Sequence, residues 1–394
     1  MRISIVSCFD DLMLKDTGAS IRILNLARNL ALFGQKVRVV IPATNFAIEQ
    51  TEGIIVSKIN GISSLRLLYA LSRLLRVSRP LSFLFYDFMF VFEVSRIIRK
   101  SDVIQIEQPW AAGFLPLLIK RILKKPLVID SHDVFQALRI KRSFFRKIAE
   151  TFLEKMAYEC ADIVLVVSEK ERQILLKSGV KRKKIWVIPN GVDTNIFAPL
   201  LARKQSLKRV HECYRLRNFP TVVFVGNMEY SPNQEAVHVI ASKLAPLIRK
   251  KTGTVNFLIV GRTSPTLNHL NLIFTGVVNS VPDFLAVSDV AIAPLFHGSG
   301  SRLKIIEYFS CGLPVVSTTL GIEGLEIKEG VNVLVEDDME RFAAKVIKLI
   351  EDKNLSRKLG RKARELAVKK YDWQKITKQL VDVYLSLFSS EATL

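Results

Sequence analysis

The chain has 394 residues, of which 49% are hydrophobic, so it has enough apolar material for two folded cores and is not a disordered chain. Its formal net charge of +21 at pH 7 predicts a negatively charged partner. The cysteines Cys8, Cys160, Cys213 and Cys311 are widely spaced and form no Cys-x-x-Cys pair, which argues against a disulfide framework and a zinc site.

The first predicted element is the apolar strand in MRISIVS, which lacks the charged start and long apolar run of a signal peptide. Together with the scattered cysteines, this start leads us to expect a cytoplasmic protein. Short apolar runs then alternate with amphipathic stretches, which indicates α/β architecture with parallel sheets. We predict strands at residues 3–7, 37–41, 103–106, 127–130, 163–167 and 185–188, and then at 222–225, 256–260, 272–275, 290–293, 315–318 and 333–335.

A basic and apolar stretch lies between Ile62 and Lys147, with 16 Lys and Arg against 6 Asp and Glu. Arginines punctuate runs of Leu and Phe, a mixture that suits anionic lipid headgroups. Because Asp87 and Glu93 interrupt the longest apolar run, we do not expect a membrane-spanning helix. Core helices with solvated basic edges are an equally good interpretation, and a nucleic-acid surface is a weaker one.

Turn-forming residues after Pro189 predict a boundary between two domains. We expect a Rossmann-like acceptor-binding domain at residues 1–196 and a Rossmann-like nucleotide-sugar-binding domain at residues 197–372, with a hinge near residues 197–218. The last predicted helix, within residues 373–394, has no strand after it and is expected to return towards the first domain. Ligands bind at the carboxyl ends of parallel strands, so we place the site in a cleft between the two sheets.

The segment from Phe296 to Gly324 combines an anion site with an acceptor for sugar hydroxyls. Its glycines Gly298 and Gly300 allow a tight loop whose N–H groups can converge on a phosphate, and the helix that opens near Arg302 adds its dipole. Arg302 and Lys304 supply full charges, and Glu307 can accept hydrogen bonds from two ribose hydroxyls. The alternative is that Lys304 and Glu307 form an ordinary surface ion pair.

Six strings in order carry a resemblance to a known family. They are DTGASIRILNLARNLALFGQKVRVV, VVSEKERQILLKSGVKRKKIWVIPNGVDTNIFAP, FVGNMEYSPNQEAV, FTGVVNSVPDFLAVSDVAIAPL, GSGSRLKIIEYFSCGLPVVST and GIEGL. With them the chain resembles, over essentially its full length, the retaining glycosyltransferases of the large family-four (group 1) class with the GT-B fold. The resemblance implies transfer of a sugar from a nucleotide-sugar with retention at the anomeric carbon, without a metal ion or cofactor.

The resemblance also assigns residues. It implies catalytic roles for His132 at the reacting sugar and for Arg302 and Lys304 at the diphosphate. His132 and Asp133 follow a strand, and His132 could instead satisfy a backbone carbonyl while Asp133 caps the next segment. Arg262 is either a phosphate partner or a solvated loop charge. The implied donor-binding residues are Gly18, Gly226, Thr275, Gly276, Val277, Gly298, Ser299, Gly300, Ser301 and Glu307.

Two positions depart from the family pattern. Many relatives carry an Arg and a Lys-Gly pair after the position of Gly226, whereas this chain continues with Asn227 and lacks that lysine. Arg302 and Lys304 are the expected substitutes. The family's glutamate pair, eight positions apart, keeps only Glu307, because Ser299 stands at the first position.

The sequence therefore predicts a retaining, metal-independent hexosyltransferase that acts on a glycan or lipid-linked acceptor in cell-surface polysaccharide or glycolipid synthesis. We expect it to lie peripherally on the inner face of the membrane through Ile62–Lys147. The alternatives are a nucleotide-sugar epimerase on the same fold and a non-catalytic membrane-associated scaffold. A nucleic-acid binder ranks last.

Overall fold

The computed structural model describes residues 1–7, 18–43, 47–60, 91–107, 109, 113–131, 144–199, 210, 212–214, 216, 219–262, 272–298 and 302–389. Two compact units make up this part of the chain. The first holds residues from Met1–Pro189 together with the C-terminal segment from Ile376, and the second holds Asn190–Gly298 and Arg302–Lys375. The domain limits predicted from the sequence, at residues 196 and 372, stay predictions.

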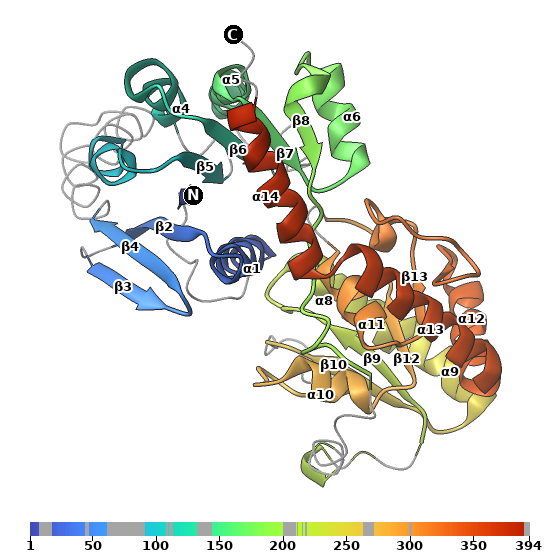
Figure 1. Ribbon diagram of the computed structural model, residues 1–394. Coiled ribbons are helices and arrows are strands. Elements are labelled where there is room, and N and C mark those ends of the chain that lie inside the picture. The colour runs from blue at the N-terminus through green and yellow to red at the C-terminus, as the bar shows by residue number, and fades with distance from the viewer. Residues whose placement is uncertain are drawn as a thin grey trace, which may run out of the picture. The chain divides into compact units, whose positions relative to one another are not determined.

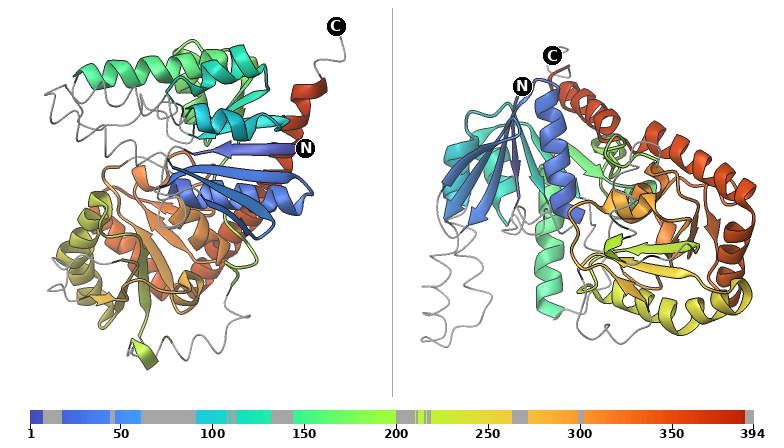
Figure 2. Two further views of the ribbon diagram at one scale, coloured as in Figure 1. Left: turned by 90° about the vertical axis from the view of Figure 1, so that its left-hand side faces the viewer. Right: turned by 90° about the horizontal axis from the view of Figure 1, so that it is seen from below.

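The first unit contains an eight-stranded sheet with the order β3-β4-β2-β1-β5-β6-β7-β8. All neighbouring strands pair in parallel except β3 and β4, which are antiparallel. Figure 2 shows α1 alongside the blue strands of this sheet, and α1 contacts β2 and β4. The strands are β1 (Arg2–Val6), β2 (Lys36–Ala43), β3 (Ala47–Thr51), β4 (Ile54–Asn60), β5 (Val103–Glu107), β6 (Leu127–Ser131), β7 (Ile163–Val166) and β8 (Ile185–Val187). The helices are α1 (Gly18–Leu32), α4 (Leu115–Leu118), η3 (Ile119–Leu123), α5 (Phe144–Cys160), α6 (Glu169–Lys177) and η5 (Arg182–Lys184).

The core of the first unit lies around the central strands, since every residue of β5, β6 and β7 is buried. Polar groups are buried there as well. The fully buried guanidinium of Arg22 on α1 contacts both carboxylate oxygens of Asp130 on β6, at 2.9 and 3.1 Å, and donates to the carbonyl of Pro189 at 3.1 Å. The sequence predicted that the last helix returns to this unit, and α14 (Trp373–Ser389) does so: its Tyr384 hydroxyl donates to Oε1 of Gln105 on β5.

The second unit contains a six-stranded, fully parallel sheet with the order β11-β10-β9-β12-β13-β14. Its strands are β9 (Thr221–Val225), β10 (Asn256–Val260), β11 (Ile273–Phe274), β12 (Val290–Ala293), β13 (Val315–Ser317) and β14 (Leu334–Val335). Its helices are α8 (Ser231–Val239), η7 (Ile240–Leu244), α9 (Ala245–Thr252), α10 (Val281–Ala286), α11 (Leu303–Ser310), η9 (Leu320–Ile322), α12 (Met339–Glu351) and α13 (Lys353–Lys370).

Helices cover both faces of this second sheet (Figure 1). Along β9, Val222 and Phe224 pack with α8, α9 and α12, whereas Val223 packs with α10, α11 and α13. This alternation is the period of two expected of a strand buried on both faces. The predicted fold class, two α/β units built on parallel or nearly parallel sheets, is confirmed.

All twelve predicted strands overlap observed ones, but the hairpin of β3 and β4 was not predicted. The strand β3 reads AIEQT and is mostly exposed, so it lacks the apolar run that marks the other strands. The turn that joins the pair has positive φ at Glu52 (47°) and at Gly53 (79°). That is the geometry of a two-residue type I′ turn, which is usually recognised by Asn or Asp before the Gly.

Among the helices of the described residues, none combines the length and the apolar character that crossing a bilayer requires.

Candidate functional site

The expected donor-binding residues of the second unit gather at the carboxyl edge of its sheet. Because the six strands are parallel, their carboxyl ends share one edge. Gly226 follows β9, Gly261 follows β10, Thr275 follows β11, and the loop from Pro294 leads from β12 to α11. Residues far apart in the chain thereby meet at one edge.

The loops after β9 and β10 touch through two glycines. The Gly226 N–H donates to the carbonyl of Val260 at 2.9 Å. A Cβ at Gly261 would lie 2.1 Å from the Gly226 carbonyl oxygen, and Gly261 has a φ of +125°. Both the space and the backbone angle therefore require glycine at 261. This requirement for glycine at 261 was not predicted from the sequence.

The segment Thr275–Val277 continues the edge beyond β10. The Gly261 N–H donates to the Gly276 carbonyl at 3.2 Å, and the Tyr214 hydroxyl donates to the Thr275 carbonyl at 3.3 Å. Gly276 has a φ of +68° with open space at its Cβ position, and the Val277 side chain is 73% exposed. These contacts fix the backbone while Val277 stays accessible.

The amino group of Lys304 lies at the centre of the cluster. Its Nζ donates to Oδ1 of Asn233 at 2.8 Å and lies 4.1 Å from the centroid of the Phe224 ring. The Asn233 amide donates in turn to the Asn227 carbonyl at 2.8 Å. A Cβ at Gly226 would come within 2.8 Å of the Asn233 Nδ2 and 3.1 Å of the Lys304 Nζ. Glycine at 226 thus leaves room for these two side chains.

The side chains of Lys304 and Glu307 on α11 are both partly buried, so these two residues do not form an exposed surface ion pair. Burial lowers the pKa of Lys304 to about 7, with Arg302 adding to the shift and Glu307 opposing it. Burial likewise raises the pKa of Glu307 to about 7, and Lys304 opposes that shift. An anion at the lysine would be a favourable partner for a cation held in surroundings of low polarity.

The start of α11 is fixed from several sides. Arg302 is the residue before the helix, is buried, and has Nη2 at 3.9 Å from Oε2 of Glu323. The Tyr308 hydroxyl accepts a hydrogen bond from the Val225 N–H at 2.7 Å, which ties α11 to the end of β9. As predicted, the helix opens at Arg302. It ends at Ser310, shortly before Gly312, which has a φ of +73°.

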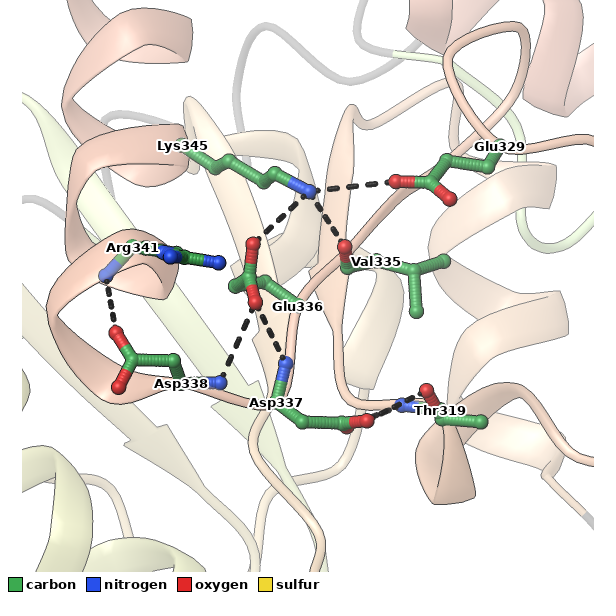
Figure 3. Close-up of polar contacts among 8 residues, drawn as sticks. All are labelled: Thr319, Glu329, Val335, Glu336, Asp337, Asp338, Arg341 and Lys345. Atoms are coloured by element: carbon green, nitrogen blue, oxygen red, sulfur yellow. Dashed lines mark hydrogen bonds and ion pairs between the residues drawn. The ribbon is translucent and has the colours of Figure 1, made fainter.

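The segment between β13 and Glu323 is held by β14 and its flanking turn (Figure 3). The Thr319 N–H and hydroxyl both donate to the carboxylate of Asp337, at 2.8 and 2.7 Å. Next to this contact, Lys345 of α12 reaches the carbonyl of Val335 at 2.5 Å and the carboxylate of Glu336 at 3.4 Å. The loop that brings Glu323 to Arg302 therefore starts from an anchored point.

The loop between β12 and α11 is described as far as Gly298. This residue has a φ of +114°, and its Cβ position lies 3.0 Å from Pro232 Cγ and 3.1 Å from the Tyr230 hydroxyl. Glycine lets the loop pass close to the start of α8. The Nδ1 atom of the neighbouring His297 contacts Oε2 of Glu235 on α8.

The other predicted site residues lie in the first unit, on an exposed loop, or outside the described residues. Gly18 is the first residue of α1 in the other unit, and Arg262 has Nη1 at 3.8 Å from Oε1 of Glu229, with both side chains well exposed. The predicted residues His132, Asp133, Ser299, Gly300 and Ser301 lie outside the described residues.

Asn233, Phe224, Tyr308 and Glu323 were not predicted as part of the site. The available signal for Asn233 was a polar residue in the first turn of the helix that follows the Gly226 loop. Its partner Lys304, however, is 71 positions away, and no local pattern links the two residues.

Comparisons with known proteins identify a family for both parts of the chain. Residues 17–196 match a family model described as Glycosyltransferase Family 4, and residues 219–352 match one described as Glycosyl transferases group 1. The chain is 26% identical over 308 residues to UDP-Gal:alpha-D-GlcNAc-diphosphoundecaprenol alpha-1,3-galactosyltransferase of Escherichia coli, covering 73% of this chain and 76% of that one. It is 25% identical to a GDP-mannose-dependent alpha-(1-6)-phosphatidylinositol monomannoside mannosyltransferase of Mycobacterium tuberculosis, covering 73% and 77%.

Solved structures share the fold. Sucrose-phosphate synthase of Thermosynechococcus elongatus superposes with a TM-score of 0.78 at 18% identity, covering 99% of this chain and 100% of that one. The protein HepE of Anabaena, solved in complex with UDP, superposes with a TM-score of 0.71 at 17% identity, covering 98% and 100%.

Proposed function

This chain belongs to the family 4 (group 1) glycosyltransferases, which use nucleotide-sugar donors, and from that premise we propose that it transfers a hexose to a glycan or lipid-linked acceptor with retention at the anomeric carbon. The observation that carries the proposal is the cluster at the carboxyl edge of the second sheet. Two cations, Arg302 and Lys304, stand at the start of α11, and the carboxylate of Glu307 follows one turn later.

In this proposal the diphosphate of the donor lies against Lys304, Arg302 and the amino end of α11. Negative charge grows on the leaving phosphate oxygen as the glycosidic bond breaks, and fixed cations that need no reorganisation stabilise that charge. Asn233 orients the Lys304 ammonium with a neutral amide oxygen, so the positive charge remains available to the donor. Charge stabilisation would then be the main contribution of the protein to the rate.

The other donor contacts follow from the same placement. The Glu307 carboxylate would accept hydrogen bonds from the two ribose hydroxyls, and the backbone of Thr275–Val277 would face the base. The Gly18 loop and the Gly298–Ser301 loop would supply N–H groups to the phosphates, and His132 would contact the reacting sugar. The acceptor hydroxyl would lose its proton to the leaving phosphate, so no protein base is assigned.

A lipid-linked acceptor is supported by the relatives. One of them is named for a diphosphoundecaprenol-linked sugar and another for a phosphatidylinositol monomannoside. The basic and apolar stretch Ile62–Lys147 would hold the protein at the inner face of the membrane, where such acceptors are made into surface polysaccharides or glycolipids. The two relatives use UDP-Gal and GDP-mannose, so both donor bases are open for this chain.

The test combines calorimetric titration of UDP-, GDP- and ADP-sugars with a transfer assay on membrane extracts. The donor identified in this way is then given to Lys304→Ala, for which we expect kcat/KM to fall by a factor of about 100 or more. Lys358→Ala, an exposed lysine of α13, is the matched control and should keep full activity. Unchanged turnover in Lys304→Ala would contradict the role assigned to this lysine, and donor conversion without an acceptor would indicate an epimerase instead.

A further inference from the structure

A second charged surface lies at the amino edge of the first sheet. The six adjacent strands β2, β1, β5, β6, β7 and β8 are parallel to one another and to β4. The segments that precede these six meet at the edge opposite their carboxyl ends. We call this set of segments the amino-edge surface. It consists of residues 1–2, 32–36, 99–102, 120–126, 159–162 and 181–184.

The amino-edge surface carries twelve Lys and Arg against three Asp and Glu. Two of the three carboxylates are engaged within it: Asp102 bonds to Arg2 at 2.7 Å, and Asp162 pairs with Lys120. Most of the cations point to solvent. Those with exposed side chains are Arg2, Lys36, Arg99, Lys100, Arg121, Lys124, Lys181, Arg182 and Lys183.

Hydrogen bonds show that neighbouring segments of this surface are in contact. The terminal amino group of Met1 donates to Oε1 of Gln35 at 2.8 Å. Lys184 donates to the carbonyls of Glu159 and Ala161, at 3.1 and 2.5 Å, which is the usual role of a lysine at a helix C-terminus. Burial lowers the pKa of Lys184, and the nearby positive charges of Lys120 and Lys181 add to this shift against the pull of Asp162.

Large apolar side chains are exposed among these charges. Leu32 is 76% exposed and Ile122 is 69% exposed, and each is next to basic segments of the surface. Phe33, at the end of α1, and Trp186, on the edge strand β8, are also exposed. Cations interspersed with apolar groups are the pattern of an interface with a charged bilayer, where the cations meet headgroups and the apolar groups enter the acyl boundary.

We propose that the amino-edge surface docks the protein on anionic lipid headgroups. The proposal rests on charge complementarity with anionic headgroups. The surface carries far more cations than are engaged at helix C-termini or in local ion pairs. The surface differs from the stretch Ile62–Lys147 predicted from the sequence, because it adds residues 1–2, 32–36, 159–162 and 181–184. The fold, and not proximity in the chain, brings its parts together.

The experiment is flotation of the full chain with vesicles of phosphatidylcholine alone and of phosphatidylcholine with phosphatidylglycerol. We expect flotation only with the phosphatidylglycerol vesicles at about 0.1 M salt, and much less of it at about 1 M salt. The fourfold variant K124E/K125E/R182E/K183E should partition at least about tenfold less. The control variant K348E/R357E/K358E/K369E makes the same change in charge on exposed positions of α12 and α13 and should float like the wild type.

A third variant, L32S/I122S, tests the apolar part and should weaken binding without changing its salt dependence. Equal flotation of the amino-edge variant and the wild type would overturn the proposal. So would absence of flotation by the wild type at low salt, or retention on RNA without vesicle binding. Calorimetric binding of the nucleotide-sugar, measured on the same variants, should be unchanged. Flotation tests the docking proposal and donor binding tests the proposed function, so either one can fail while the other stands.

Discussion

At the scale of residues, the candidate site depends on a lysine and a glutamate that are held in unfavourable surroundings until a donor arrives. Burial moves the pKa of Lys304 down and that of Glu307 up, both to about 7. The neutral amide of Asn233 holds the lysine in place without cancelling its charge. Such groups cost stability in the empty protein and gain favourable partners when a diphosphate and a ribose bind.

The first prediction concerns pH. Donor binding needs Lys304 protonated, so affinity should fall as pH rises above about 7, and it needs Glu307 ionised, so affinity should also fall below about 7. Calorimetry with the nucleotide-sugar, whose diphosphate diester does not titrate near neutrality, should give a maximum close to pH 7. Glu307→Gln should remove the acid limb, and Lys304→Met should remove the alkaline limb. A profile that is flat from pH 5 to 9, to within about a factor of two, is incompatible with these roles.

The second prediction concerns Asn233. The substitution Asn233→Asp keeps the shape of the side chain but places a negative charge 2.8 Å from the Lys304 amino group. We expect donor affinity to fall about tenfold or more, because the aspartate competes with the diphosphate for the lysine. The measurement is calorimetric titration, with Asn354→Asp at the exposed start of α13 as the control. Equal affinity in the two variants would show that Lys304 does not contact the donor.

The chemically distinctive residues of the cluster could be predicted from the sequence, and their partners could not. Arg302, Lys304 and Glu307 stand close together in one segment with a glycine-rich start. Asn233 and Phe224 lie in other elements, and they reach the lysine only because β9 and β12 are neighbours in the sheet. Local sequence patterns do not predict which strands become neighbours in the sheet.

At the scale of elements, glycine contacts between loops set the shape of the carboxyl edge. Gly226 leaves room for side chains, whereas Gly261 leaves room for backbone. This difference predicts different tolerance to substitution, because a displaced side chain can rotate and a displaced loop must shift as a whole.

The third prediction follows from that difference. Gly261→Ala should lower the free energy of unfolding by about 2 kcal/mol or more and weaken donor binding, because its Cβ would overlap the Gly226 carbonyl. The matched control is Gly330→Ala in the same unit, where φ is +73° but the space at the Cβ position is open, and we expect a cost near 1 kcal/mol there. The measurement is thermal unfolding with and without the donor. Equal losses in the two variants would mean that backbone angle alone, and not the loop contact, matters at 261.

Strands that are buried on both faces could be predicted from the sequence, because they appear in it as short apolar runs. The strands β5, β6, β7 and β10 are buried throughout and were predicted nearly to the residue. The exposed strand β3 was missed because it has no apolar face to mark it. The apolar pattern by which a strand is predicted reflects its burial more than the intrinsic β-propensity of its residues.

At the scale of the whole molecule, segments from both ends of the sequence contribute buried contacts to the first unit. Arg22 near the start contacts Asp130 and the carbonyl of Pro189, and Tyr384 of α14 bonds to Gln105. The Arg22–Asp130 pair is fully buried, so loss of one partner leaves an unpaired charge in the core.

The fourth prediction tests this buried pair. Arg22→Leu should lower the free energy of unfolding of the first unit by about 3–5 kcal/mol, and the double variant Arg22→Leu/Asp130→Leu should recover part of that loss. Arg2→Leu, which removes an exposed pair with Asp102, should leave the free energy of unfolding almost unchanged. Differential scanning calorimetry measures all three. A double variant no more stable than Arg22→Leu would argue that packing, and not the unpaired carboxylate, causes the loss.

The most direct test of the account is a crystal structure with the nucleoside diphosphate that binds best. We expect a diphosphate oxygen within about 3 Å of the Lys304 amino group and the ribose hydroxyls within about 3 Å of the Glu307 carboxylate. A nucleotide bound elsewhere, with both side chains free of contact, would contradict the assignment of the donor site.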